Sequence, residues 1–308
     1  CPRWQLVDEG GNQCRGPEGG TKCSVACPGS MFAVGGAMGS MARALMGFIP
    51  SGIQRRLKQA VRDGRLRDGS ADAGKFVRRA GYLREMLSLA DAMVAPSNYV
   101  RDIFIENGFD AAKIHVIPHG IALPECMPVT HSDKVRFGYI GSFAPLKGVG
   151  MLVDAFSNLG TGAELHIHGH GGENHDLIVG RLMERAAGKA VFFHGRYERE
   201  SLGGLLAGLD AVVVPSMWPE TFGIVVREAL SCGVPVIVSD CGALPEAVRD
   251  GIDGMVFANG DADILSQKMR AFMECPELIK IYSLSIHQVK SIKEHAREIV
   301  AIYEDLTK

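Results

Sequence analysis

The sequence predicts an α/β fold in which helices cover both faces of a doubly wound, Rossmann-like parallel sheet. Short apolar strands rich in β-branched residues alternate with helical segments from Val135 to Asp240. Turn residues follow the strands, and the chain has 308 residues, of which 46% are hydrophobic. This length and composition suffice for two α/β domains, or for one and a half.

Charge gives little indication of the partner. The net charge of -2 carries no global signature of nucleic-acid binding, so we expect no nucleic-acid partner. Arg55 to Arg84 holds ten Lys or Arg residues against three Asp residues, an excess of seven positive charges. A solvated helix face and a surface for anionic membranes both stay open as interpretations of this basic stretch.

The chain starts at Cys1 rather than Met and has no signal-peptide pattern, so we expect a fragment or a processed form. Four of its eight cysteines lie in a turn-rich N-terminal loop, at Cys1, Cys14, Cys23 and Cys27. A structural zinc site, two disulfides and free thiols are all compatible with their spacing. The other four are expected to be free buried thiols in a reducing compartment: Cys126, Cys232, Cys241 and Cys275.

The regular pattern begins with a short buried strand within Ala90 to Ser97. Ser97 is a suitable N-cap for a following helix, which Gly108 would end. A second strand over 113–121 is broken by Pro118 and Gly120 and runs into a linker that ends near Asp133.

The remaining elements alternate. Strands are predicted over 135–142, 163–171, 190–195, 211–216 and 234–240, and helices over 149–159, 176–187, 201–209, 222–233 and, as an amphipathic C-terminal segment, 285–306. Ligands of doubly wound sheets bind at the carboxyl ends of the strands. The predicted site is therefore formed by the loops at Gly141, Gly169, Gly195, Ser216 and Asp240.

Two carboxylates stand eight positions apart at the start of one predicted helix. Glu220 lies in the turn before it, where the unpaired amides of Thr221 to Ile224 favour an anion or a hydroxyl-rich ligand. Glu228 lies on the otherwise apolar helix, where a buried carboxylate requires a cation or a polar ligand. Either both acids bind a ligand, or Glu220 complements the helix dipole and Glu228 pairs with Arg227 or another cation.

Two further segments would reach the same sheet edge. Lys147 lies just before a helix, where it would either form a phosphate cradle with the amides near Gly148 or stay exposed to solvent. His166, His168 and His170 alternate along a strand, which leaves open a metal site or ordinary core and surface histidines.

The segments YIGSFAPLKGVGMLVDAF, LHIHGHGGE and the run from Val191 to Phe257 resemble the glycosyltransferases of family GT4, also called glycosyltransferase group 1. The resemblance covers about Ala90 to the C-terminus, and its most specific part is the Glu-x7-Glu motif from Glu220 to Glu228. It implies a GT-B fold with a partial N-terminal acceptor domain over 1–118 and a complete C-terminal donor domain over 119–288. Residues 289–308 would form a helix that packs back toward the N-terminal domain.

The resemblance also implies a retaining, metal-independent transfer of a sugar from a UDP-, GDP- or ADP-sugar, with no cofactor. Glu220 and Lys147 would be the catalytic residues: Glu220 would hold sugar hydroxyls, and Lys147 would neutralise the leaving diphosphate. Glu228 would hold the ribose, and the base would lie near Arg196 and Tyr197. The remaining donor-binding residues are Thr221, Phe222, Gly223, Gly141, Ser142 and Gly169.

The charges that develop during the reaction agree with these roles for Lys147 and Glu220. Cleavage of a glycosyl phosphate makes the leaving diphosphate more negative and the sugar oxocarbenium-like. We therefore expect Lys147 and the acids to serve opposite ends of the donor, with Glu220 binding hydroxyls rather than attacking covalently. Family members often carry an Arg where this sequence has Ser142, so part of the phosphate clamp is expected from elsewhere.

The expected acceptor is a glycan or lipid-linked intermediate in cell-envelope or polysaccharide assembly, in the cytoplasm or at the inner face of the membrane with peripheral contact. About 100 residues of an N-terminal domain would be missing, so this chain is expected to bind donor even if it is inactive. A GT-B-like nucleotide-sugar epimerase and a non-catalytic nucleotide-sugar-binding module are the alternatives. A dinucleotide oxidoreductase is disfavoured, since HGHGGE departs from the GxGxxG pattern.

Overall fold

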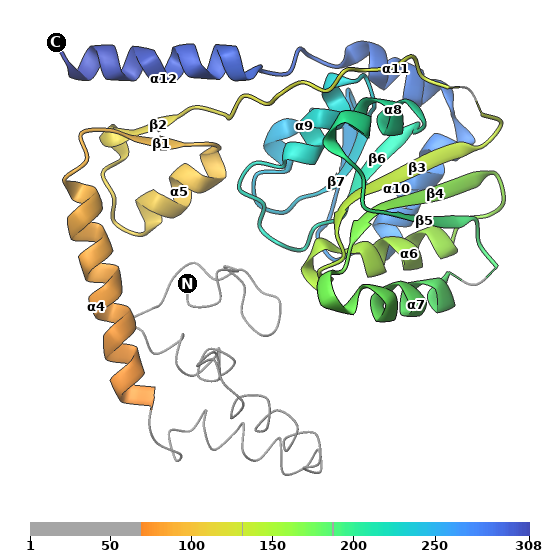
Figure 1. Cartoon of the computed structure of the whole chain (residues 1–308), viewed down its shortest axis with the longest axis horizontal. Helices are drawn as coiled ribbons and strands as arrows, with labels where there is room; N and C mark the ends of the chain where they lie inside the picture. Colours follow the sequence, from red (N-terminus) through yellow and green to blue (C-terminus); the bar gives the residue numbers. More distant parts are fainter. Residues whose placement is uncertain (1–68, 131, 187) are drawn as a thin grey trace. The chain divides into compact units, whose positions relative to one another are not determined.

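The computed structural model describes residues 69–130, 132–186 and 188–308 (Figure 1). The cysteine cluster at Cys1, Cys14, Cys23 and Cys27 and part of the basic stretch lie outside these residues. Within these ranges, no helix is both long and apolar enough to cross a membrane.

The chain divides into two compact units. The described parts of the first are residues 69–91, which include α4 (Gly69–Ser88), and residues 103–111, and the second comprises 92–102 and 112–308. The second unit therefore extends beyond the predicted donor domain over 119–288 on both sides. The predicted boundary at residues 118 and 119 stays a prediction.

The second unit contains a six-stranded, all-parallel sheet with strand order β5-β4-β3-β6-β7-β8. The strands are β3 (Val135–Ser142), β4 (Ala163–His170), β5 (Val191–Gly195), β6 (Ala211–Val214), β7 (Val236–Ser239) and β8 (Gly254–Phe257). The chain builds outward from β3 to β5, then returns to the other side of β3 with β6. The strand order thus reverses between β3 and β6, which confirms the predicted doubly wound fold.

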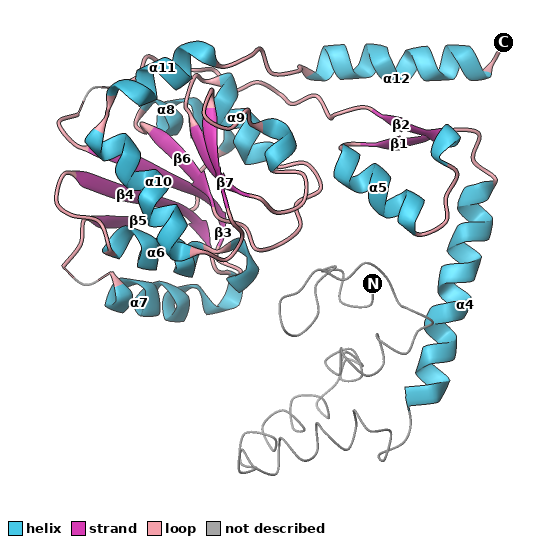
Figure 2. Cartoon of the chain, turned by 180° about the vertical axis from the view of Figure 1, so that it is seen from behind, coloured by secondary structure: helices cyan, strands magenta, loops and turns pink. Residues whose placement is uncertain are grey.

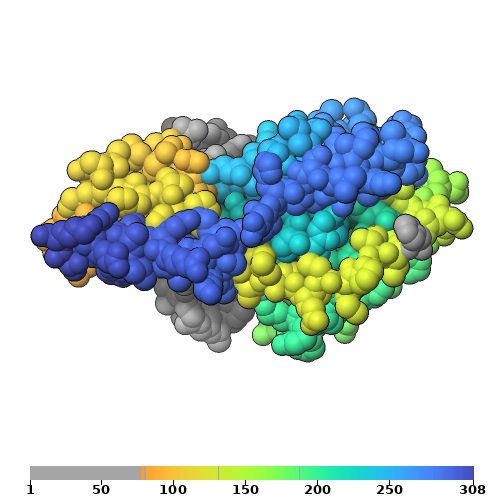
Figure 3. All heavy atoms as spheres, turned by 90° about the horizontal axis from the view of Figure 1, so that it is seen from above, coloured from red at the N-terminus to blue at the C-terminus, as the bar shows by residue number. Residues whose placement is uncertain are grey.

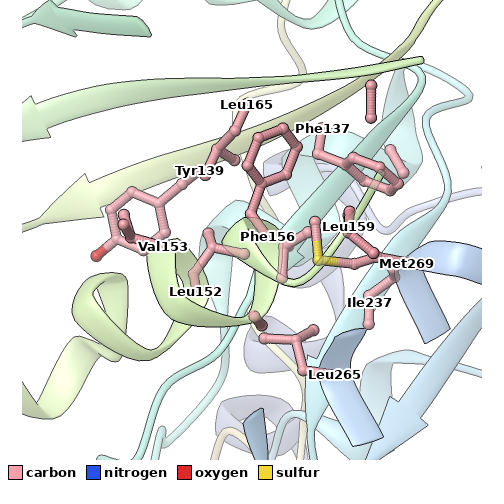
Figure 4. Packing of buried hydrophobic residues seen from close by; sticks show 14 of the residues in the cluster. Phe137, Tyr139, Leu152, Val153, Phe156, Leu159, Leu165, Ile237, Leu265 and Met269 are labelled. Carbon is pink, nitrogen blue, oxygen red and sulfur yellow. The ribbon is translucent and has the colours of Figure 1, made fainter. Parts of the chain in front are cut away.

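Helices cover both faces of this sheet (Figure 2). One face packs against α6 (Val149–Ser157), α7 (His175–Arg185) and α10 (Ala262–Glu274), and the other against α8 (Leu202–Ala207) and α9 (Ile224–Ser231). Figure 4 shows Phe137 and Leu165 of the sheet packed among Leu152 and Phe156 of α6 and Met269 of α10. Burial from both sides explains why the central strands are apolar at nearly every position.

The β4–β5 edge of the sheet is covered less completely. Along β4, buried residues alternate with partly exposed ones, and His166 and His168 belong to the partly exposed set. Because side chains alternate between faces, both imidazoles lie on the face that α8 and α9 cover elsewhere. This edge is where a ligand could reach the sheet directly.

A smaller parallel sheet of two strands, β1 (Met93–Ala95) and β2 (Ile114–Val116), confirms the two predicted strands before the linker. Ser97 caps α5 (Asn98–Glu106), since its Oγ accepts a hydrogen bond of 3.2 Å from the amide of Val100. Gly108 ends that helix with φ of 87°, as predicted.

The C-terminal third differs from the prediction. The single helix expected over 285–306 is wrong at its start: α11 (Glu277–Ser285) ends there, and α12 (Ile292–Leu306) begins after an extended stretch. A capping box between Ser291 and Glu294 fixes the start of α12. β8 (Gly254–Phe257), α10 (Ala262–Glu274) and α11 (Glu277–Ser285) are further elements that were not predicted from the sequence.

The cysteines give a second correction. Cys126 in the linker and Cys232 at the C-cap of α9 form a disulfide, so the expectation of free thiols is wrong for this pair. Cys241 is free and buried, as expected, whereas Cys275 is free but exposed. The disulfide fastens the linker to the helix that carries Glu228.

Candidate functional site

The predicted phosphate cradle and the acidic turn meet where the strand order reverses. Lys147 ends a short 3-10 helix, Pro145–Lys147, after β3, and Glu220 lies in the loop after β6. The Nζ of Lys147 lies 2.5 Å from the Oε1 of Glu220. The two residues expected at opposite ends of the donor are therefore in direct contact in this structure.

Backbone contacts hold Lys147 in place. The carbonyl of Leu146 accepts hydrogen bonds from the amides of Met217 (2.8 Å) and Trp218 (3.0 Å). Gly148 has φ of 76°, and a Cβ there would lie 1.9 Å from the carbonyl oxygen of Pro215. Only glycine permits this close approach of the two loops.

Glu220 is held equally firmly. Its Oε1 also accepts a hydrogen bond of 3.0 Å from Ser216 Oγ, and its carbonyl accepts one of 2.7 Å from the amide of Ala243. Ser239 Oγ in turn donates to the carbonyl of Ser216 at 2.6 Å. The carboxylate therefore has a defined position before any ligand binds.

The charge of Glu220 acts on its neighbours. Burial raises the pKa of Cys241 to about 11, and the charges of Glu220 and Asp240 add to this effect. Burial, together with the charge of Glu220, also raises the pKa of Tyr139 well above its usual value. Both groups stay neutral at physiological pH, so Lys147 is the cation that balances Glu220.

Glycines let β3 and β4 pack closely near their carboxyl ends. Gly169 has φ of 148°, and a Cβ there would lie 1.7 Å from the carbonyl oxygen of Gly141. Tyr139 Oη donates a hydrogen bond of 2.6 Å to the carbonyl of Ser142. The backbones at Gly141 and Gly169 are therefore in close contact near the ends of the two strands, and only glycine fits at position 169.

The turn before α9 presents its amides as predicted. Among the described residues, no acceptor pairs with the amides of Thr221 to Ile224, while Ser97 Oγ donates to the carbonyl of Thr221 at 2.8 Å. The Phe222 ring is buried beneath Arg227, whose Cζ lies 3.6 Å from the ring centroid. Burial lowers the pKa of Arg227 to about 10, and this cation packs on Phe222 instead of pairing with Glu228.

Glu228 is 4% exposed and pairs with Arg199, which the sequence analysis did not single out. Arg199 Nη1 lies 3.2 Å from Glu228 Oε1. Burial raises the pKa of Glu228, and the Arg199 guanidinium opposes that rise. Of the two alternatives left open for Glu228, the structure shows a cationic partner, which comes from the segment after β5 rather than from Arg227.

Tyr197 lines a cavity of about 560 Å³ over the poorly covered edge of the sheet. The other lining residues are Glu125, Met127, His168, Glu200, Ser201, Gly204 and Leu205. Burial and the charge of Glu228 raise the pKa of Tyr197, although Glu228 itself does not line this cavity. Arg196 directly precedes Tyr197 but does not line the cavity; its Nη2 lies 3.4 Å from Nδ1 of His170.

The histidines stack on one another. His168 and His194 have ring centroids 4.3 Å apart, and His170 and His175 have theirs 4.1 Å apart. Burial lowers the pKa of His168 to about 4, and the neighbouring imidazoles add to this. In the described part of the chain, no three His, Cys, Asp or Glu side chains are placed to hold a metal ion.

Two networks result: Lys147, Glu220 and Ser216 at the reversal of strand order, and Glu228, Arg199 and Tyr197 beside the cavity. The strand-end rule selected the loop at Ser216 but gave this residue no role. No spacing signal identifies Arg199, since it lies 29 positions from Glu228 in a surface loop.

Comparisons with known proteins agree with this architecture. The family model described as "Glycosyl transferases group 1" matches residues 128–285, and the model described as "Glycosyltransferase Family 4" matches residues 67–124. The first of these matches alone covers half of the chain.

Two curated relatives are both named D-inositol 3-phosphate glycosyltransferase. The protein from Actinosynnema mirum is 32% identical over 170 residues, which is 48% of this chain and 40% of the relative. The protein from Xylanimonas cellulosilytica is 30% identical over 207 residues, which is 59% of this chain and 49% of the relative. The matches thus span less than half the length of these relatives.

Solved structures share the fold. Sucrose-phosphate synthase from Thermosynechococcus elongatus aligns with a TM-score of 0.65 and 24% identity, over 75% of this chain and 62% of that protein. Anabaena HepE in complex with UDP and glucose aligns with a TM-score of 0.65 and 20% identity, over 74% of this chain and 67% of that protein. These similarities support the GT-B fold.

Proposed function

Since this chain belongs to the group 1 glycosyl transferase family, we propose that its second unit binds a nucleotide-sugar donor and that the whole protein transfers the sugar to an acceptor hydroxyl with retention. One observation carries this proposal. A lysine and a carboxylate from the loops after β3 and β6 meet at the reversal of strand order. Doubly wound sheets bind their ligands at this point.

The donor would lie across the two networks. Its diphosphate would face Lys147 and the backbone at Gly141 and Gly169, and its sugar hydroxyls would face Glu220 and the free amides of the turn before α9. The ribose would lie at Glu228 and the base beside Tyr197, at the cavity. A bound diphosphate would compete for Lys147, which would release Glu220 to accept hydroxyl hydrogen bonds.

The chemistry follows from these charges. The bond between the sugar C1 and the diphosphate oxygen breaks, and Lys147 stabilises the negative charge that the leaving diphosphate gains. The acceptor oxygen bonds to C1 on the same face, and its proton passes to a phosphate oxygen of the leaving group. Glu220 stabilises the oxocarbenium-like sugar through its charge and its hydroxyl contacts, without a covalent bond.

The names of similar proteins indicate which donors and acceptors to test first. UDP and glucose are bound in the HepE structure, so UDP-sugars are the first donors to test, followed by GDP- and ADP-sugars. We propose a glycan or lipid-linked acceptor that is used in cell-envelope or polysaccharide assembly. The names of the two relatives make a phosphorylated inositol a further acceptor to test. A cytoplasmic location and a peripheral contact at the inner face of the membrane are part of the same proposal.

A thermal-shift screen against UDP, GDP, ADP and their sugar conjugates tests the donor site. One nucleotide at about 100 times its dissociation constant should stabilise the folded chain by about 2.7 kcal/mol. Lys147→Met should remove most of this stabilisation, because it removes the cation that faces the diphosphate. Lys293→Met, which changes an exposed lysine on α12, should leave it intact.

Each outcome of the screen is informative. Stabilisation that Lys147→Met does not reduce would contradict the assigned diphosphate position. Donor binding without transfer or hydrolysis, even in a longer form of the protein, would favour the non-catalytic binding module. Interconversion of the sugar without an acceptor would favour the epimerase.

Donor binding should not depend on a divalent metal, because Lys147 supplies the positive charge at the diphosphate. We expect dissociation constants for UDP measured with excess EDTA and with excess Mg²⁺ to agree within about twofold, whereas Lys147→Met should weaken binding about tenfold or more. An affinity that EDTA lowers as much as Lys147→Met does would show that a metal shares this role.

A further inference from the structure

Arg199 connects three parts of the molecule that the proposed donor site uses. It begins the 3-10 helix Arg199–Ser201 after β5, and its Nη1 lies 3.2 Å from Oε1 of Glu228 on α9. Its Nη2 donates a hydrogen bond of 3.0 Å to the carbonyl of Ala122 in the linker. The Arg199 guanidinium thus contacts both the Glu228 carboxylate and the backbone of the linker.

The linker is also fastened at several points on the C-terminal side of this contact. The disulfide joins Cys126 to Cys232, and the amide of Thr130 donates to the carbonyl of Ala207 at 2.9 Å. The backbone at Glu125 lies so close to α8 that a Cβ on Gly203 would be 1.8 Å from the Glu125 carbonyl oxygen. In Figure 3 the linker forms a yellow to yellow-green band on the surface. Arg199 therefore donates to a fixed carbonyl, which holds the guanidinium in one orientation.

The second carboxylate oxygen of Glu228, Oε2, has no partner among the described residues. Among the described residues, only Arg199 pairs with this carboxylate, and it does so through Oε1. Within the described part of the chain, Oε2 of Glu228 is not completely enclosed, although the side chain as a whole is only 5% exposed. A carboxylate oxygen without a partner can accept hydrogen bonds from a ligand.

We propose that Arg199 is a positioning residue that holds Glu228 ionised and turned so that its free oxygen accepts the hydroxyls of the donor's ribose. This inference rests on the proposed donor site. Arg199 itself does not touch the ribose: it acts through Oε1 and leaves Oε2 to the ligand. Its side chain is 58% exposed, so its replacement should not disturb the core.

Ionisation of Glu228 depends on this contact. Burial alone raises the pKa of this carboxyl, and Arg199 opposes the rise. Tyr197 is the other titratable group that interacts with Glu228 among the described residues, and its own raised pKa keeps it neutral. Without Arg199, the carboxyl should become protonated at a higher pH and then accept hydroxyl hydrogen bonds more weakly.

Ribose discrimination is the decisive measurement. Binding of UDP, 2′-deoxy-UDP and inorganic diphosphate should be measured by calorimetry for the parent chain, Arg199→Met, Arg199→Lys and Arg181→Met, with GDP and ADP and their deoxy forms in parallel. Arg199→Met should weaken the ribonucleotide about tenfold and the deoxynucleotide and diphosphate much less, because a hydrogen bond to a charged group is lost. Arg199→Lys should restore part of the preference. Arg181→Met, on the exposed surface of α7, should behave like the parent.

A carboxyl titration tests the ionisation step without any ligand. Carbon-13 shifts of the glutamate carboxyls, followed from about pH 4 to about pH 8, should show a raised pKa for Glu228 in Arg199→Met, with the signal assigned by its absence in Glu228→Gln. An unchanged Glu228 titration would overturn the proposal. Equal weakening of ribonucleotide, deoxynucleotide and diphosphate would also overturn it, because that pattern indicates only a lost long-range charge.

These measurements separate the proposal from the proposed function. If Lys147→Met abolishes nucleotide binding and Arg199→Met leaves the ribose preference intact, the donor site stands and the role of Arg199 is wrong. If the parent binds no nucleotide, the proposed function fails and the assignment of a ribose to Glu228 fails with it.

Discussion

Glu220→Gln is expected to weaken binding of the nucleotide sugar and, in a form of the protein that turns over, to lower the rate of transfer by about 10²- to 10³-fold. The substitution keeps the shape of the side chain but removes the charge that Lys147 meets at 2.5 Å and Ser216 at 3.0 Å. A neutral amide would stabilise the oxocarbenium-like sugar less and would hold Lys147 less firmly.

The split between nucleotide and sugar nucleotide makes this prediction specific. Because Glu220 is assigned to the sugar, Glu220→Gln should lower affinity for UDP-glucose about tenfold while the affinity for UDP changes less than about threefold. Calorimetry with both ligands measures the ratio directly. Glu184→Gln, at an exposed position on α7, is the matched control. Equal losses for UDP and UDP-glucose would place Glu220 at the diphosphate instead of at the sugar.

The central architecture could be predicted from the sequence because burial from both faces leaves an unambiguous pattern. Strands β3, β6 and β7 are apolar at most positions, and each was predicted within two residues of its observed bounds. β8 was not identified, since Gly254–Phe257 is short and starts with glycine. α10 had readable signals in its Asp261 N-cap and in the helical spacing of Leu265, Met269 and Phe272, which were not used.

The candidate site was predictable only where topology determines it. The rule that parallel sheets bind ligands at strand ends selected Lys147 and Glu220, which stand 73 positions apart and prove to be in contact. No comparable rule predicts the hydrogen bond from Arg199 to the carbonyl of Ala122 or the disulfide between Cys126 and Cys232. Both contacts depend on the path that the linker takes past α8 and α9. The roles assigned to the site residues stay predictions until ligands are measured.

Reduction of the Cys126–Cys232 disulfide is expected to lower the free energy of unfolding of the second unit by about 4–5 kcal/mol. The two cysteines are 106 positions apart, so the bond closes a long loop and removes much of the freedom of the unfolded chain. For a unit of this size, such a loss corresponds to a decrease in Tm of about 10–15 °C. The relevant measurement is thermal unfolding of the parent chain with and without dithiothreitol, beside Cys126→Ser and Cys232→Ser.

The pattern across the variants distinguishes the disulfide from simple packing. Cys126→Ser, Cys232→Ser and the double substitution should all show about the same Tm, and reductant should lower none of them further. Cys275→Ser, at an exposed free cysteine, should keep the Tm and the reductant sensitivity of the parent. Because the linker contributes Glu125 and Met127 to the wall of the cavity beside Tyr197, loss of the disulfide should also weaken nucleotide binding. A parent whose Tm does not change in reductant would show that the two thiols are not joined, and the linker would then be held by its noncovalent contacts, such as those with Arg199 and at Thr130.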